Sequence, residues 1–165
     1  MMLGDPARLL ELADIARKAG TAGQLNVLEW GSGESTAVLL AEICRRESGR
    51  LLTIDHDSSY QAQVLAGLMG RPGLIPFVAD LAGNLDPSSA EPNYATLPMT
   101  LPWGWDLIVI DGRRRLECAL VASAISSPIT VVALHDYRRE RYALVKTILD
   151  VVKDLPEYRL MRRRS

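Results

Sequence analysis

The sequence predicts one α/β domain over residues 1–165, in which helices cover both faces of a doubly wound, mostly parallel sheet. Two observations lead to this prediction. A length of 165 residues fits a single domain. Five short, continuously apolar runs alternate with segments of helical periodicity. Such runs are typical of strands that are buried on both faces, as they are in three-layer αβα folds.

The expected elements follow in order from the N-terminus. A first helix begins at Asp5-Pro6, because aspartate caps helices and proline fits a first turn. Pro76 has no N–H for a central ladder, so its strand is placed at a sheet edge. The apolar runs are expected as strands at 25–30, 51–55, 74–80, 106–111 and 129–134, with a short sixth strand at 158–161. The periodic segments are expected as helices at 35–47, 60–69, 113–127 and 138–155.

Residues 81–105 form a long segment without regular periodicity, which is rich in proline and contains Tyr94, Trp103 and Trp105. Loops of this length inside a small domain are usually functional or disordered. The prolines and aromatic residues favour a lid that packs on the domain.

The composition argues against several classes of protein. A net charge of −1 indicates neither nucleic acid nor a membrane surface as a partner. The N-terminus has no signal-peptide core, and no apolar run reaches the roughly 20 residues of a membrane span. Cys44 and Cys118 lie in helical patterns with apolar neighbours, so we expect two buried thiols rather than a disulfide or a metal pair. A cytoplasmic location is expected.

A glycine turn, Gly31-Ser32-Gly33, separates the first strand from the helix after it. Glycine allows a positive φ and close approach of a ligand, and a helix start presents free N–H groups. Thr36 stands where a dinucleotide fingerprint has its third glycine. The turn by itself is therefore compatible with a cofactor or with a purely steric role.

Polar side chains follow the predicted strands: Glu29, Asp55, Asp80, Asp111 and the pair His135-Asp136. The carboxyl ends of parallel strands meet at one edge of a sheet, where such folds bind ligands. Asp55 comes 22 residues after Gly33, close to the roughly 20 at which an acid meets a ribose. Each acid alone has helix capping as its alternative role, but the set favours a cofactor site. Glu29 is expected beneath the turn, bonded to its backbone or to the cofactor's amino group.

Four segments resemble the class I S-adenosylmethionine-dependent methyltransferases: 29–33 (EWGSG), 53–57 (TIDHD), 78–80 (VAD) and 106–112 (DLIVIDG). The resemblance implies a Rossmann-like methyltransferase fold and S-adenosyl-L-methionine as cofactor. It implies that the glycine block holds the methionine part, Asp55 the ribose hydroxyls, and Asp80 the adenine amino group with Leu81 beside the ring. The implied cofactor-binding residues are Glu29, Gly31, Ser32, Gly33, Ser35, Thr36, Asp55, His56, Asp80, Leu81 and Asp111.

Three further patterns, WGSGxST at 30–36, DGRxRxxC at 111–118 and HDYxRxxY at 135–142, resemble a bacterial subgroup of that family. The family sheet has seven strands and ends in an antiparallel hairpin. Because this chain ends near its sixth predicted strand, the hairpin is expected to be shortened or missing. A homodimer through the incomplete sheet edge is the expected assembly.

The predicted catalytic residues are His135, Asp111 and Asp136, at the ends of adjacent strands. His135 is expected as a general base, since imidazoles titrate near neutral pH, with a capping role as the alternative. One O-methyltransferase branch of the family binds Mg²⁺ with acids at these strand ends. His135 replaces the first of those acids, and Mg²⁺ prefers oxygen ligands. A Mg²⁺ site at Asp111 and Asp136 is therefore not favoured.

Arginines cluster at 113–115 and at 138, 139 and 141, after two of the ligand-side strand ends. Guanidinium groups suit carboxylates and phosphates, although a solvated helix face is the alternative explanation. The predicted substrate-binding residues are Arg113, Arg115, Tyr137, Arg138 and Trp103.

The function expected from these observations is methyl transfer from S-adenosyl-L-methionine to a small, anionic acceptor, with O-methylation preferred. A non-catalytic module that binds S-adenosylmethionine or S-adenosylhomocysteine is the alternative. A nicotinamide-dependent oxidoreductase is less favoured, because Thr36 interrupts the dinucleotide fingerprint. A nucleic-acid methyltransferase is less expected, because the net charge is balanced.

Overall fold

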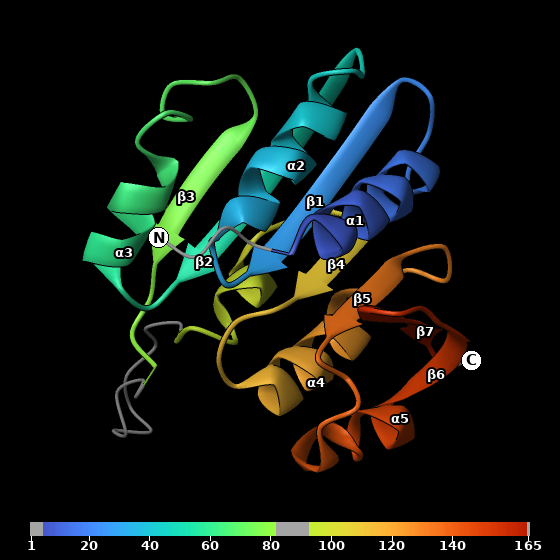
Figure 1. Ribbon diagram of the computed structural model, residues 1–165. Coiled ribbons are helices and arrows are strands. Elements are labelled where there is room, and N and C mark those ends of the chain that lie inside the picture. The colour runs from blue at the N-terminus through green and yellow to red at the C-terminus, as the bar shows by residue number, and fades with distance from the viewer. Residues whose placement is uncertain (1–4, 82–92, 165) are drawn as a thin grey trace.

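A computed structural model of the chain describes residues 5–81 and 93–164, and within them the strands form one seven-stranded sheet (Figure 1). The strand order is β3-β2-β1-β4-β5-β7-β6. The first five strands are parallel, and β7 runs antiparallel to both β5 and β6. The strands are β1 (Gln24–Trp30), β2 (Ser48–Asp55), β3 (Leu74–Val78), β4 (Leu107–Ile110), β5 (Val131–His135), β6 (Leu149–Asp154) and β7 (Tyr158–Arg163).

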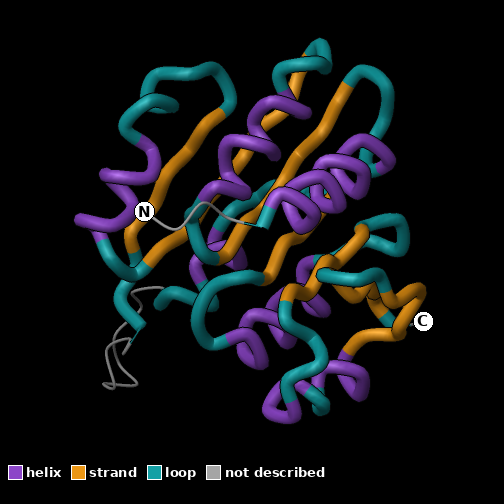
Figure 2. Tube along the Cα trace, in the orientation of Figure 1, coloured by secondary structure: helices purple, strands orange, loops and turns teal. Residues whose placement is uncertain are grey.

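Helices cover both faces of this sheet, as Figures 1 and 2 show. One face is covered by α1 and α2, and the other by α4 and α5, while α3 lies beside β3. The helices are α1 (Pro6–Lys18), α2 (Glu34–Ile43), α3 (Ser58–Leu65), α4 (Arg115–Ile125) and α5 (Val145–Ile148), with 3₁₀ turns η1 (Leu97–Thr100) and η2 (Glu140–Tyr142). The predicted three-layer αβα fold with a mostly parallel sheet is confirmed.

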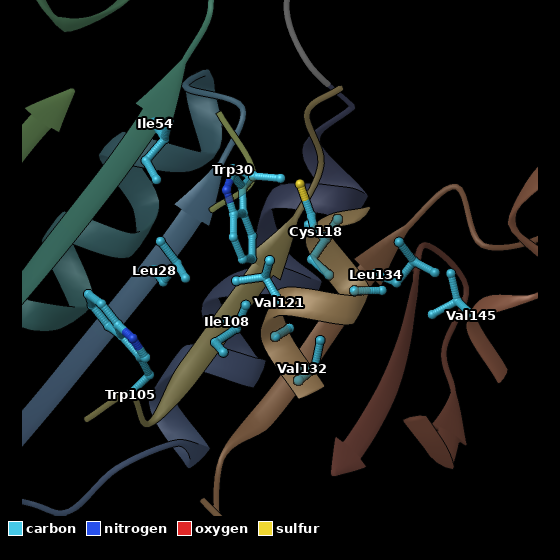
Figure 3. Packing of buried hydrophobic residues seen from close by; sticks show 14 of the residues in the cluster. Leu28, Trp30, Ile54, Trp105, Ile108, Cys118, Val121, Val132, Leu134 and Val145 are labelled. Atoms are coloured by element: carbon cyan, nitrogen blue, oxygen red, sulfur yellow. The ribbon is translucent and has the colours of Figure 1, made fainter. Parts of the chain in front are cut away.

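Alternation along each central strand produces two separate cores. In β1, Val27 points to the α1–α2 face, whereas Leu28 and Trp30 point to the α4 face. Figure 3 shows Cys118 and Val121 of α4 in the second core. Each fully buried aliphatic side chain in these cores contributes roughly 1.5–3 kcal/mol. Burial on both faces explains why these strands read as continuous apolar runs.

The segment after β3 joins the α4 core. Tyr94 is fully buried, and its carbonyl accepts a hydrogen bond of 3.0 Å from the indole N–H of Trp30. The predicted packing of the lid is thus seen for residues 93–105, whereas residues 82–92 lie outside the described part of the chain.

The prediction of a long helix at 138–155 is wrong. That segment contains only the short turns η2 and α5 before β6 begins at Leu149. The apolar residues from Leu144 to Val152 suit either a helix face or a strand, and pairing with β7 decides for the strand. The helices predicted at 35–47 and 113–127 are each shorter than expected, ending at Ile43 and at Ile125.

The strand predicted at 158–161 is confirmed as β7, and it forms an antiparallel hairpin with β6. The hairpin is therefore present in a short form, with six residues in each strand, and it is not missing. The homodimer was inferred from an incomplete sheet edge, but β6 of the same chain forms that edge. The homodimer therefore stays a prediction without this support. The edge position of β3, inferred from Pro76, is confirmed.

The two cysteines differ from each other. Cys118 is fully buried in α4, as predicted, but Cys44 is exposed at the end of α2, so the prediction of two buried thiols is wrong for Cys44. Among the described residues, no helix is long and apolar enough to cross a membrane.

Candidate functional site

A cleft of about 1360 Å³ opens at the carboxyl ends of β1, β2 and β4. It is lined by the glycine turn, the loop after β2, the exposed side of α3 and the arginine-rich loop after β4. The segment around η2 and one side chain from α1 complete the lining. This is the edge of the sheet at which α/β folds of this kind bind ligands.

The glycine turn is held closely against the backbone after β4. Gly31 has a φ of +96°, and a Cβ there would lie 2.5 Å from the Cα of Gly112. A Cβ on Gly112 would in turn collide with the hydroxyl of Tyr94. Two glycines facing each other therefore let the ends of β1 and β4 approach, so the steric role considered for this turn is real.

Glu29 lies under the turn but does not reach the cleft. Its carboxylate is fully buried and accepts hydrogen bonds from the hydroxyls of Ser35 (2.5 Å), Thr36 (2.7 Å) and Thr53 (2.7 Å). Burial raises the pKa of Glu29 to about 7, although the three hydroxyl bonds oppose this shift. The expected bond from Glu29 to the turn backbone or to a cofactor amino group is replaced by bonds to side chains.

These hydroxyl groups belong to a buried network that fixes the turn. The Ser32 hydroxyl lies 2.8 Å from the Thr53 hydroxyl and accepts a hydrogen bond of 2.9 Å from the Gln61 amide. Thr36 Oγ1 accepts a hydrogen bond of 3.0 Å from the N–H of Gly33. Ser35 and Thr36, predicted to bind the cofactor, thus support the turn from below, although Ser35 also lines the cleft.

Asp55 connects the turn to the loop after β2. Its side chain accepts hydrogen bonds from the N–H groups of Ser32 (3.0 Å), His56 (2.7 Å) and Asp57 (3.0 Å). His56 Nδ1 also lies 3.1 Å from Oδ1, whereas Oδ2 accepts from Ser32 alone, so Oδ2 has one acceptor position left for a ligand. Both Asp55 and His56 line the cleft, where the sequence placed them. Asp80 and Leu81 follow β3, next to residues outside the described range, and are not among the described residues lining the cleft.

Asp111 is the predicted catalytic residue that faces the cleft. Arg8 Nη1 lies 2.8 Å from Asp111 Oδ2, and Arg115 Nη2 lies 3.2 Å from Oδ1. His135 Nδ1 lies 2.8 Å from the same Oδ1, without the alignment of a hydrogen bond. Asp111 is therefore held between two guanidinium groups and an imidazole.

His135 and Asp136 do not line the cleft. His135 lies behind Asp111, with Nε2 3.6 Å from a carboxylate oxygen of Glu157. Asp136 pairs with Arg139 at 2.7 Å. The prediction that His135 abstracts a proton directly from the acceptor does not fit this placement. Within residues 5–81 and 93–164 no group of three or more candidate side chains is arranged to hold a metal, which leaves Mg²⁺ without support.

Arg115, which was predicted to bind substrate, lines the cleft, but its donors are used within the chain. Its buried guanidinium donates to the carbonyls of Gly112 (2.9 Å), His135 (2.6 Å) and Asp111 (3.1 Å). It also contacts the carboxylates of Asp111 and Asp136, so little donor capacity remains for a ligand. Arg113 also lines the cleft, and unlike Arg115 its side chain is exposed.

Three other predicted substrate residues lie elsewhere. The hydroxyl of Tyr137 donates to the carbonyl of Leu155 at 3.0 Å, and Arg138 stacks 5.4 Å from the centre of the Tyr137 ring. These contacts support the C-terminal hairpin. Trp103 lies at the amino ends of the strands, with the Arg50 guanidinium 4.9 Å from its ring centre, and so it is at the opposite edge from the cleft.

Several cleft residues were not among the predicted site residues, although Arg141 belongs to an arginine cluster noted in the sequence. Arg8 comes from α1, Tyr60 from α3, Tyr94 from the segment after β3, and Arg141 and Tyr142 from η2. Arg141 stacks over the ring of Tyr142 at 4.8 Å. Only the last two lie within a quoted pattern, because the HDYxRxxY segment ends at Tyr142.

No family model matches the chain, and neither does any curated protein. Solved structures, however, share its fold. They include a candidate rRNA methylase from Clostridium thermocellum (TM-score 0.64, 10% identity, 99% of this chain and 99% of that chain). A candidate caffeoyl-CoA O-methyltransferase from Staphylococcus aureus has a TM-score of 0.63 and 11% identity, over 97% of this chain and 85% of that chain. The precorrin-6y C5,15-methyltransferase from Geobacter metallireducens GS-15 has a TM-score of 0.63 and 14% identity, over 99% of this chain and 91% of that chain. At these identities the likeness shows a Rossmann-like methyltransferase fold.

Proposed function

We propose that the chain catalyses methyl transfer from S-adenosyl-L-methionine to a small, anionic acceptor, with an oxygen as the methylated atom. The observation that carries this proposal is the convergence of the glycine turn, Asp55 and Asp111 on one cleft in a methyltransferase fold. The likeness in fold supports methyl transfer in general, and the choice of acceptor rests on the charges around the cleft.

The residues fit an adenosyl cofactor. A Cβ on Gly33 would meet Ser35 Oγ only at 3.6 Å and Tyr60 Oη at 4.0 Å, so the backbone of the turn is open to a ligand. Asp55 retains one acceptor position for a hydroxyl on the same wall. The cavity of about 1360 Å³ exceeds the 300–1,000 Å³ of an ordinary ligand pocket, which leaves room for an acceptor as well.

The acceptor side of the cleft carries cations that are not paired. Arg113 and Arg141 are exposed, line the cleft and form no ion pair with another described residue. Arg141 is held in place by stacking on Tyr142, whose ring also lies 5.2 Å from the guanidinium of Arg115. Two guanidinium groups at the mouth suit a carboxylate or phosphate on the acceptor.

An oxygen that is already charged also fits the chemistry of Asp111. The cofactor supplies an electrophilic methyl group, and the protein mainly has to position the acceptor and exclude water. The Asp111 carboxylate is already engaged by the guanidinium groups of Arg8 and Arg115. An acceptor oxygen that is already an anion needs no general base, so Asp111 has only to hold Arg8 and Arg115 in position.

One observation favours the alternative of a binding module without catalysis. Both Asp111 and Arg115 are committed to ion pairs within the chain, and His135 is separated from the cleft by Asp111. A protein of this kind would bind S-adenosylmethionine and S-adenosylhomocysteine but transfer no methyl group.

Calorimetry with S-adenosylmethionine, S-adenosylhomocysteine and NAD tests the cofactor first. Binding of NAD alone would overturn the proposal. If the adenosyl ligands bind, a screen of carboxylates, phenols and phosphate esters with radiolabelled methyl donor tests catalysis, with and without Mg²⁺. Arg113→Gln and Arg141→Gln are expected to raise the KM for the acceptor and to leave cofactor affinity unchanged. Binding without turnover for every acceptor would favour the module.

A further inference from the structure

One side of the cleft, formed by residues of 112–117 and 139–142, is rich in arginine and is called the basic wall below. Its charged lining residues are five arginines and one glutamate: Arg113, Arg114, Arg115, Arg139, Arg141 and Glu117. The side toward β2 is lined by acids instead: Glu34, Asp55 and Asp57. An anionic group on a ligand is therefore attracted to the basic wall and kept from the other side.

The arginines of the basic wall differ in what they already bind. Arg115 is buried and donates to groups of the chain itself. Arg139 Nη2 lies 2.7 Å from Asp136 Oδ2, and Arg114 Nε lies 3.4 Å from Glu117 Oε1. Arg113 and Arg141 are exposed and form no ion pair with another described residue. The wall thus presents two guanidinium groups whose charge has no partner in the described part of the chain.

Arg113 and Arg141 belong to segments that Arg115 and Tyr142 hold together. The Arg141 guanidinium lies 4.8 Å from the centre of the Tyr142 ring, and the Arg115 guanidinium lies 5.2 Å from the same centre. Arg115 also donates 2.9 Å to the carbonyl of Gly112, the residue directly before Arg113. The loop after β4 is therefore fixed against the segment around η2, and both unpaired guanidinium groups lie on one side of the cleft.

A phosphate monoester matches two unpaired guanidinium groups better than a carboxylate does. At neutral pH its charge is about −1.5 to −2, and it has three strong acceptor oxygens. A carboxylate carries one negative charge on two oxygens. Each guanidinium can donate two parallel N–H groups to phosphate oxygens. One phosphate can therefore balance both charges, whereas one carboxylate leaves a positive charge without a partner.

We infer that the acceptor carries a phosphate monoester, which Arg113 and Arg141 bind at the mouth of the cleft. This inference rests on the proposed function, because it names the chemical class of that acceptor. The phosphate anchors the acceptor, and the methylated oxygen is a separate group that lies deeper in the cleft, toward the glycine turn. A cavity of about 1360 Å³ has room for such an acceptor beside the cofactor.

The experiment compares three probes that share a phenyl ring and differ in the anion. Phenyl phosphate is a monoester, methyl phenyl phosphate is a diester with one negative charge, and benzoate is a carboxylate. Their affinities are measured by calorimetry on protein saturated with S-adenosylhomocysteine, at constant ionic strength. The wild type is expected to bind phenyl phosphate about 10-fold or more tightly than either of the other two, because only the monoester engages both guanidinium groups fully.

Three variants locate the phosphate. Arg113→Gln and Arg141→Gln are each expected to weaken phenyl phosphate by about 10-fold, and benzoate by less than about threefold, since one guanidinium still serves a single charge. Arg138→Gln is the matched control, because Arg138 is exposed, stacks on Tyr137 and is absent from the cleft lining. It should leave all three affinities unchanged. Circular dichroism and the affinity for S-adenosylhomocysteine report whether each variant keeps its fold and its cofactor site.

The outcomes separate this inference from the proposed function. If the wild type binds S-adenosylhomocysteine but binds phenyl phosphate no more tightly than benzoate, the inference is wrong and the proposed function stands. The inference is also wrong if the preference for phenyl phosphate survives in both Arg113→Gln and Arg141→Gln, or if Arg138→Gln reduces it as much as they do. If the wild type does not bind S-adenosylhomocysteine, the proposed function fails and the inference fails with it.

Discussion

Glu29→Gln is expected to make the protein more stable above neutral pH, although it removes a carboxylate from a satisfied hydrogen-bond network. Glu29 is completely buried, and burial raises its pKa from 4.5 to about 7. Glutamine has nearly the same shape and keeps one carbonyl acceptor. The hydroxyls of Ser35, Thr36 and Thr53 can rotate to accept from its amide, so the network is retained.

The sign follows from linkage. The folded state binds the Glu29 proton more tightly than the unfolded state, so protonation stabilises the fold. This contribution is complete below pH 4.5 and is lost as pH rises through about 7. The difference in pKa corresponds to about 3 kcal/mol, of which roughly 2 to 3 kcal/mol is lost between pH 5 and 8. The variant does not have this loss.

Urea unfolding measures the effect, followed by tryptophan fluorescence between pH 5 and 9. The free energy of unfolding of the wild type minus that of Glu29→Gln should fall by roughly 2 to 3 kcal/mol over this range. Every other titrating group is common to both proteins and cancels in the difference. Glu47→Gln, at an exposed position, is the matched control and should show no such trend. A difference that is constant with pH would refute the argument that burial controls the ionisation of Glu29.

Three further predictions concern residues whose surroundings differ from expectation. Arg115→Ala is expected to cost about 3 kcal/mol or more, because it removes one donor from each of two carboxylates and three carbonyls around a buried charge, whereas Arg113→Ala should change stability by less than about 0.5 kcal/mol in urea unfolding. Gly31→Ala is expected to lower the melting temperature by about 8 °C or more, since φ is +96° and the methyl group would meet backbone; an unchanged melting temperature would contradict this. An aromatic disulfide reagent should label Cys44 in the native protein and Cys118 only after unfolding, because burial also raises the pKa of the Cys118 thiol; labelling of both would show that α4 opens.

The parallel part of the fold was predictable because its strands are buried on both faces. Val27, Leu28 and Trp30 point to two different cores, so β1 is mostly apolar, and its polar residues Asn26 and Glu29 do not alternate with a period of two. The hairpin was harder to predict because β6 is exposed along five of its six residues. With little burial to impose a period of two, its apolar residues matched a helix equally well, and pairing with β7 decided the structure.

The candidate site was predictable in position but only partly in detail. Acids at strand ends do converge on one edge, as the fold class requires. Their directions depend on the strand pleat and on neighbours that are distant in sequence. Glu29 points to the α2 face and is covered by Ser35 and Thr36, whereas Asp111 opens to the cleft. A sequence in which both residues follow apolar runs does not distinguish a carboxylate that supports the turn from one that faces a ligand.

The arginines show most clearly why spacing alone was insufficient. Arg114 adopts a left-handed conformation with φ of 48° and lies directly before α4, which begins at Arg115. Both Arg113 and Arg115 line the cleft, but Arg113 is exposed, whereas the Arg115 guanidinium donates to three carbonyls of the chain. The cation that does reach the floor of the cleft, Arg8, is 103 residues from its partner Asp111 and belongs to no motif.

The position of Arg8 gives α1 a function beyond covering the sheet. The same helix carries Glu11, whose carboxylate accepts hydrogen bonds from the N–H groups of Glu157 (3.1 Å) and Tyr158 (2.9 Å) at the turn of the hairpin. Glu157 also lies 3.6 Å from His135, which contacts Asp111. One helical turn of α1 thus holds both the hairpin and the carboxylate at the cleft floor. Because His135 connects the partner of Arg8 with a partner of Glu11, substitutions at Arg8 and Glu11 should not be additive in their effect on ligand binding, whereas substitutions at Arg8 and at the distant Trp103 should be.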